Sequence, residues 1–194
     1  MQARVTLREA LEAAKRVGAC AEAVNEISQM KDWDEFSQHP NAPEWVRWYA
    51  HNVVKGRVQE LEPIIASDPR WSCNYARDVI GGRWPEAERV IARNPESAYN
   101  YACDVIRGRW PEAEPVIARD PKWAYHYARY VIGGRWPGAE PVIAQDAAWA
   151  YCYAYGVIGG RFPEAESVIA KDPLCAYNYA CYVVKDRWPE AEVA

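Results

Sequence analysis

The chain has 194 residues, of which 50% are apolar and 13% aromatic, and its formal net charge is −4. A net charge this small and negative excludes a strong general attraction to nucleic acid or to anionic membranes. The sequence contains neither an apolar run long enough to span a bilayer nor a signal-peptide pattern, so we expect a cytoplasmic protein.

Residues 1–42 hold no copy of the repeat that fills the rest of the chain, and we expect them to form an N-terminal helical cap. Thr6 and Glu9 have the spacing of a capping box, and apolar residues follow at helical spacing, which predicts one helix over 6–30. A short helical segment is expected at 32–36. A cap of this kind covers the apolar end of a repeat array. A helix that binds a partner is the alternative.

From residue 43 to residue 194 the chain is a tandem repeat with a period of 26 residues. The motif RWPEAE, or a close variant of it, begins at Arg83, Arg109, Arg135, Arg161 and Arg187. A fixed period in this range is typical of stacked supersecondary units. The sequence therefore predicts an all-α fold, an α-solenoid of six two-helix repeats behind the N-terminal cap. The repeats start at Pro43, Pro69, Pro95, Pro121, Ala147 and Pro173.

Each repeat carries start and stop signals for two helices. An Asp or Asn before proline, as in Asp120-Pro121, predicts an N-cap with proline in the first turn. The first helix is expected to run about twelve residues to a glycine pair such as Gly133-Gly134, whose second member we expect in the left-handed conformation. A Trp-Pro pair then predicts the start of a second helix of about two turns.

Several apolar residues are the same in every repeat and lie three or four residues apart, which places them on one face of the first helix. We expect this face to contact the neighbouring repeats. Its most prominent members are Tyr49, Tyr75, Tyr101, Tyr127, Tyr153 and Tyr179.

An arginine and a glutamate five residues apart, such as Arg109 and Glu114, are also constant. We expect each arginine to cap carbonyl groups of the first helix and to pair with the glutamate of its own or a neighbouring repeat. A row of guanidinium groups that bind phosphates is the alternative. The other carboxylate of the motif, such as Glu112, is interpreted as stabilising a helix N-terminus. Acid–base catalysis would need two carboxyl groups with separated pKa values in one cleft.

No motif of the sequence indicates an enzyme, a metal site or a cofactor. His39, His51 and His126 are far apart in the chain, so we expect no metal site. The glycine pairs are interpreted as helix terminators rather than phosphate-binding loops. The six cysteines include no C-x-x-C pair and are expected to be reduced thiols.

Four positions of the repeat, counted as 2, 6, 9 and 13 from its first residue, change freely, and we interpret the other positions as constant. Their spacing places them on one face of the first helix. A constant scaffold with one variable face is typical of repeat proteins that bind a partner, whereas drift on a solvated face is the alternative. Aromatic and arginine side chains dominate interface hot spots. The predicted partner-binding residues are Trp48, His51, Arg70, Asn74, Arg77, Asn100, Arg107, Lys122, His126, Arg129 and Tyr155.

The repeat unit DVIxGRWPEAExVIAxxPxxAYxYA resembles tandem α-helical repeats in uncharacterised proteins of bacteriophages and some bacteria. The segments LREALEAA and ACAEAV are similar to the region that often precedes those repeats. The resemblance implies a phage-associated helical repeat protein of the host cytoplasm, and it transfers no catalytic residues. Because small phage proteins of this kind are often inhibitors of host defence, it also implies an inhibitor of a bacterial defence complex, such as an anti-CRISPR protein.

The first function hypothesis is therefore a non-enzymatic scaffold that binds a protein partner, a host defence protein or complex, through the variable face. The alternative is a nucleic-acid-related role, either direct binding of phosphates by the basic residues of that face or mimicry of DNA by the repeated carboxylates. A pocket that sequesters a nucleotide signal is a third hypothesis. We also expect no membrane partner. The C-terminal end has no comparable cap, and the alternatives for it are fraying and oligomerisation with another copy of the chain.

Overall fold

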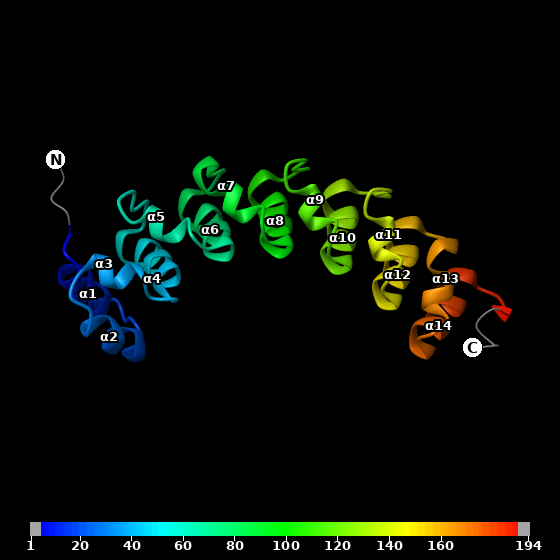
Figure 1. The fold of residues 1–194 in the computed structure, drawn as a ribbon, viewed down its shortest axis with the longest axis horizontal. Coiled ribbons are helices and arrows are strands. Elements are labelled where there is room, and N and C mark those ends of the chain that lie inside the picture. The colour runs from blue at the N-terminus through cyan, green and yellow to red at the C-terminus, as the bar shows by residue number, and fades with distance from the viewer. Residues whose placement is uncertain (1–4, 190–194) are drawn as a thin grey trace. The chain divides into compact units, whose positions relative to one another are not determined.

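The computed structural model describes residues 5–189, and every regular element within this range is helical. The predicted all-α tandem repeat is confirmed. The chain divides into two compact units, residues 1–91 and residues 92–194, which we call the N-terminal unit and the C-terminal unit (Figure 1). The second helix predicted for the sixth repeat and the C-terminal end, for which fraying and oligomerisation are the alternatives, extend beyond the described residues.

The N-terminal unit contains the cap and the first two repeats. Its elements are α1 (Leu7–Arg16), α2 (Ala21–Ser28), α3 (Trp33–Ser37), α4 (Ala42–Tyr49), η1 (Ala50–Val54), α5 (Glu62–Ile65), α6 (Pro69–Tyr75), η2 (Ala76–Ile80) and α7 (Pro85–Ile91), where η denotes a π-helical segment. The predicted helical segment at 32–36 corresponds to α3.

The cap consists of three short helices, so the prediction of one helix over 6–30 was wrong. The capping box is present: Glu9 N–H donates to Thr6 Oγ1 at 3.3 Å, and Thr6 N–H donates to the Glu9 carboxylate at 2.8 Å. The helical spacing of apolar residues continues through Gly18, but this glycine has a φ of +85° and follows the end of α1. α2 then begins after Cys20, whose Sγ accepts a hydrogen bond from Ala23 N–H.

The C-terminal unit contains the third to sixth repeats. Its elements are α8 (Pro95–Tyr101), η3 (Ala102–Ile106), α9 (Glu114–Ile117), α10 (Pro121–Tyr127), η4 (Ala128–Ile132), α11 (Glu140–Ile143), α12 (Ala147–Tyr153), η5 (Ala154–Ile158), α13 (Pro163–Ile169), α14 (Pro173–Tyr179) and η6 (Ala180–Val184). Within this unit α8, α10, α12 and α14 lie side by side in chain order (Figure 1).

The predicted N-caps of the first helices are confirmed from the second repeat onward. In each case the side-chain oxygen accepts a hydrogen bond from the backbone N–H three residues later, as Asp120 does from Trp123 at 3.1 Å. In the fifth repeat alanine replaces proline after Asp146, and the cap is retained. The capping residues are Asp68, Asn94, Asp120, Asp146 and Asp172.

Each first helix changes from α to π geometry in its second half. In the fourth repeat seven residues of α10 are followed by five of η4, which together match the predicted length. Gly133 N–H and Gly134 N–H both donate to the Ala128 carbonyl, at 2.9 and 3.1 Å. The second glycine was the wrong choice for the left-handed residue, because Gly133 has the positive φ, +74°. The same repeat position is left-handed at Lys55, Gly81, Arg107, Gly133, Gly159 and Lys185.

The second helix of the repeat has two lengths, and proline explains the difference. α7 and α13 have seven residues, close to the predicted two turns, whereas α5, α9 and α11 have four. Each of the short helices has proline as its second residue. Pro115, for example, has no N–H to donate to the carbonyl of Pro111, so the preceding residues form a turn instead of helix. Arg89 and Ser167 occupy this position in the long helices.

The core consists of the constant residues of the repeat. A fully buried tyrosine of the first helix packs against the aromatic residue nine positions later in the same repeat. The ring centroids are 5.1 Å apart for Tyr75 and Trp84 in the N-terminal unit, and 5.1 Å apart for Tyr127 and Trp136 in the C-terminal unit. Alanines such as Ala76 and Ala128 and the isoleucines of the second helix, such as Ile91 and Ile143, fill the remaining space and have no exposed surface. The expected apolar contact face is therefore confirmed for the tyrosines from Tyr75 onward.

Candidate functional site: the exposed face of the first helices

The constant arginine and glutamate form an ion pair inside each of the first five repeats, as expected for a structural role of the arginines. Arg109 donates from Nε and Nη2 to the two carboxylate oxygens of Glu114, at 2.8 and 2.9 Å. The glutamate side chain of this pair is only 15% exposed. The same two-bond pairing joins Arg57 to Glu62, Arg83 to Glu88, Arg135 to Glu140 and Arg161 to Glu166.

A buried tyrosine of the next repeat donates to the glutamate of the ion pair at Glu62, Glu114, Glu140 and Glu166. The Tyr127 hydroxyl donates to Glu114 Oε1 at 3.0 Å and accepts from Trp110 N–H at 2.6 Å. The paired arginine lowers the pKa of Glu114, while burial raises the pKa of Tyr127 to about 12. The guanidinium row therefore has a structural use that does not require phosphate, and the glutamate row is neutralised by its own arginines.

In the N-terminal unit, the predicted basic residues belong to a local network. Asp78 accepts from Arg77 Nε at 2.7 Å and from Arg47 Nη1 at 2.9 Å. The guanidinium carbons of Arg47 and Arg70 lie 5.5 and 5.0 Å from the centre of the Trp71 ring. These contacts hold the arginines in place and offset part of their charge, which reduces their availability for a row of phosphates.

The remaining predicted residues of the N-terminal unit do not form a cluster with these arginines in the contacts that the structure shows. His51 is exposed on η1, and Asn74 is half-buried on α6. Trp48 lines a cavity beneath the cap. The predicted partner-binding residues of this unit therefore lie in separate local environments.

In the C-terminal unit, Lys122 and His126 lie within a cluster of aromatic rings. The Lys122 ammonium is 4.2 Å from the centre of the Trp123 ring, a cation–π contact. The His126 ring contacts the rings of Tyr99, Trp149 and Tyr130 at centroid distances of 5.8, 5.5 and 5.9 Å. Burial, and then Lys122, lower the pKa of His126, so the imidazole is neutral at pH 7. His126 thus joins aromatic side chains from three repeats.

Arg129 and Tyr155 continue this surface toward the fifth and sixth repeats. Arg129 donates to the Gly156 carbonyl and lies over the Tyr130 ring. Tyr155 is 59% exposed, and its ring contacts Tyr151 at 6.2 Å and Tyr182 at 6.3 Å. Arg129 and Tyr155, which were predicted, therefore share this surface with Tyr130, Tyr151 and Tyr182, which were not.

Asn100 and Arg107 complete the predicted residues of the C-terminal unit. Asn100 is half-buried on α8. Arg107 is exposed at the left-handed residue that ends η3, with a φ of +59°. Repeat position 13 therefore ends the first helix. The residue there, glycine or a basic residue, has the left-handed backbone conformation in every repeat.

The interpretation of all other repeat positions as constant was wrong, and it missed three exposed tyrosines, Tyr130, Tyr177 and Tyr182. Positions 5 and 10 also vary, and in the C-terminal unit they carry Tyr99, Tyr125, Tyr151 and Tyr177, and Tyr130 and Tyr182. Alignment of the repeats already contains this signal, since position 10 also holds Asn52, Asp78, Asp104 and Gly156. We name the aromatic face after its members: Tyr99, Trp123, Tyr125, His126, Tyr130, Trp149, Tyr151, Tyr155, Tyr177 and Tyr182.

Within residues 5–189, no group of three or more His, Cys, Asp or Glu side chains is placed to hold a metal ion. None of the described helices is both long and apolar enough to cross a membrane. The six cysteines, all within the described range, are free thiols.

No protein-family model, curated protein or solved structure matches the chain.

Proposed function

We propose that the protein is a non-enzymatic helical repeat scaffold that binds a protein partner through the aromatic face of its C-terminal unit. The observation that carries the proposal is the exposure of tyrosines that the core does not use: Tyr130 is 59%, Tyr177 66% and Tyr182 54% exposed. Contiguous exposed apolar surface on a soluble protein is typical of an interaction site.

The chemistry of the face suits a protein surface. Tyrosine offers a large contact area at a low cost in conformational entropy, and its hydroxyl can hydrogen-bond at the rim. Ring contacts such as that of Tyr155 with Tyr151 hold the side chains in place before binding. Lys122 and Arg129 add positive charge beside the rings. We therefore expect the partner to present apolar groups together with acidic ones.

The biological setting of the proposal comes from the repeat motif. Its resemblance to phage repeat proteins supports a phage-associated inhibitor that acts in the bacterial cytoplasm. The proposed partner is a protein of a host defence complex, for which an anti-CRISPR role is one example. The aromatic face supports the proposal that the protein binds a partner. The resemblance supports the proposal that this partner is a host defence protein.

Affinity capture from bacterial lysate tests the proposal. The full chain would be compared with a variant carrying Tyr130→Ser, Tyr155→Ser and Tyr182→Ser, since these exposed side chains contribute little to the core. The matched control carries Glu112→Ser, Arg119→Ser and Glu164→Ser, which are exposed on the second-helix segments. We expect a specific protein to be captured by the wild type and the control and lost from the tyrosine variant, with unchanged circular dichroism. Equal capture by all three proteins would contradict the assignment.

Nucleic-acid binding is a second candidate, favoured by one observation. Lys122 and Arg129 lie against aromatic rings, and single-stranded nucleic acids are bound by stacking rings combined with cations. A gel-shift titration with single-stranded DNA and RNA at low and high salt tests it, because binding to phosphates weakens steeply as salt rises. Mimicry of DNA receives less support, because Glu114 and its equivalents are paired with arginine.

A further inference from the structure

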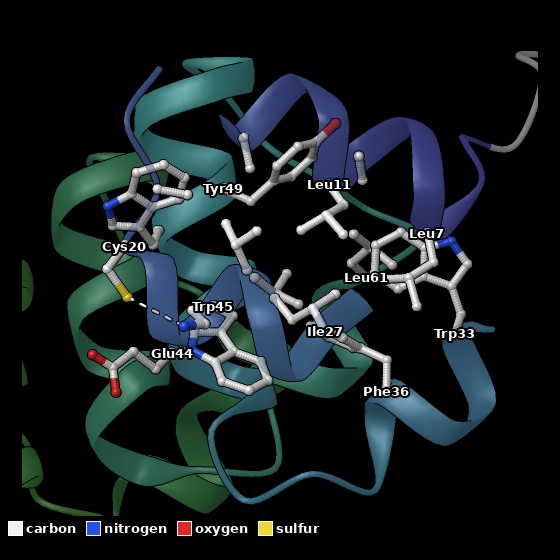
Figure 2. Close-up of a pocket in the computed structure, with 17 residues that line it drawn as sticks. Leu7, Leu11, Cys20, Ile27, Trp33, Phe36, Glu44, Trp45, Tyr49 and Leu61 are labelled. Carbon is white, nitrogen blue, oxygen red and sulfur yellow. Dashed lines mark hydrogen bonds between the residues drawn. The ribbon is translucent and has the colours of Figure 1, made fainter. Parts of the chain in front are cut away.

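A cavity of about 220 Å³ lies inside the N-terminal unit, between the cap and the first repeat (Figure 2). The cap helices and α4 contribute its walls. Figure 2 shows Leu11, Ile27, Phe36, Tyr49 and Leu61 around the cavity. The walls are mainly apolar, and several of them are aromatic rings.

Two of the polar groups near the cavity already have hydrogen-bond partners. Cys20 Sγ accepts from Ala23 N–H at 3.4 Å, and Trp33 Nε1 donates to the Val5 carbonyl at 2.9 Å. The exposed Glu44 carboxylate points away from the cavity in Figure 2. The wall residues also include Trp45 and Trp48, with their indole N–H groups, and Tyr49, with its hydroxyl, so the wall is mainly apolar with a few polar atoms.

The cavity is open to molecules from solution. Its wall residues Ile27, Trp45, Tyr49 and Leu61 are half-buried rather than fully buried. In the repeats the equivalent interior is closed, since Ala87 and Ile91 have no exposed surface. The apolar wall of the cavity therefore meets solvent when the cavity is empty, and an apolar occupant would cover it.

We propose that this cavity is a binding site for a small uncharged apolar molecule. A dry cavity of about 150 Å³ binds benzene, with six carbon atoms, so a cavity about half as large again fits about nine. Aromatic hydrocarbons and medium-length alkyl chains are the classes of this size. The site is separate from the aromatic face, and the proposal does not depend on partner binding there.

Naphthalene and n-octanol are suitable probes of the full chain. We expect saturable binding in a titration followed by NMR, with nuclear Overhauser contacts from the probe to the methyl groups of Leu11 and Ile27, and an increase in Tm. Ala14→Leu places extra methyl groups into the cavity from α1 and should weaken binding at least tenfold. Ala13→Leu makes the same change on α1 at a residue outside the cavity wall and should leave binding unchanged.

Three outcomes would overturn the proposal. The first is the absence of saturable binding of either probe to the wild-type chain. The second is equal affinity in the Ala14→Leu and Ala13→Leu variants, which would place the bound probe elsewhere. The third is binding without any contact to Leu11 or Ile27, a result that needs only the wild type and so holds even where Ala14→Leu fails to fold.

Discussion

The hydroxyl of Tyr127 accepts a hydrogen bond at 2.6 Å from the backbone N–H of Trp110, which belongs to the preceding repeat. The same hydroxyl donates to Glu114, the partner of Arg109. One phenol therefore fixes both the backbone and the ion pair of the repeat before it. Tyr153 and Tyr179 make the equivalent bonds later in the C-terminal unit.

Tyr127→Phe should destabilise the protein although it removes only one oxygen atom. The change leaves the buried N–H of Trp110 without its acceptor and takes one donor from Glu114. An unsatisfied buried polar group costs about 1–3 kcal/mol, so the free energy of unfolding should fall by that amount. Urea denaturation followed by circular dichroism would measure it.

The matched control is Tyr130→Phe, because Tyr130 is 59% exposed and its ring contacts do not need the hydroxyl. Its effect should stay within about 0.5 kcal/mol, as for most surface changes. Similar losses in both variants would show that the hydroxyl of Tyr127 is not a special link between repeats.

The buried tyrosines also predict sensitivity to alkaline pH. Burial raises the pKa of Tyr75, Tyr127 and Tyr179 to about 12, above the ordinary value near 10. Between these values the folded chain retains protons that the unfolded chain has lost, so stability is full below pH 10 and falls as pH rises toward 12. Each tyrosine contributes a slope of up to about 1.4 kcal/mol per pH unit.

Urea denaturation at pH 9, 10 and 11 would measure this dependence, and Tyr127→Phe should reduce its slope because one titrating group is removed. A free energy of unfolding that is constant over this range would contradict the raised pKa values.

The sequence was sufficient to predict the repeat, the N-caps of its first helices and its apolar core, because these depend on local signals that are copied from repeat to repeat. Asp120 before Pro121 predicts a helix start, and the structure shows the cap bond to Trp123 N–H. The constancy of Arg109 and Glu114 indicated an ion pair. The tyrosine that completes it was predicted only as an apolar residue, since its hydroxyl bonds depend on how consecutive repeats stack.

The exposed face was predictable only in part. The spacing of four, three and four identified Lys122, His126, Arg129 and Tyr155. It omitted position 10, where Tyr130 and Tyr182 are exposed, and position 5, where Tyr177 is exposed. The π-helical second half contributed to the difference, because its turn is wider than the 3.6-residue period assumed for the whole helix. The cavity beneath the cap depends on tertiary packing that no local pattern describes.

Arg107→Gly should stabilise the protein. Arg107 has a φ of +59°, and a residue with a Cβ atom pays about 1–2 kcal/mol for the left-handed conformation that glycine adopts readily. Part of the gain is offset by the greater freedom of glycine in the unfolded chain, so we expect an increase of about 0.5–1 kcal/mol in the free energy of unfolding.

Gly133→Arg is the reverse change at the same position of the next repeat, where φ is +74°, and it should lower stability by a similar amount. Thermal and urea denaturation of both variants would measure the two shifts. Changes in the same direction would show that backbone conformation does not control stability at this position.

Pro115→Ser should lengthen α9 toward its N-terminus. α13 has Ser167 at the equivalent position and begins at Pro163, four residues before Ser167. α9 begins at Glu114, one residue before Pro115. The new N–H can donate to the Pro111 carbonyl, which contributes about 0.5–1.5 kcal/mol. Loss of the proline makes the unfolded chain more flexible at a cost of about 0.4–1 kcal/mol, so stability should change little while the helix grows. NMR amide exchange and backbone Overhauser contacts over 111–115 would detect the added turn, and Ser167→Pro should remove the corresponding turn from α13. An α9 that still begins at Glu114 in the variant would show that packing, rather than the missing N–H, sets its length.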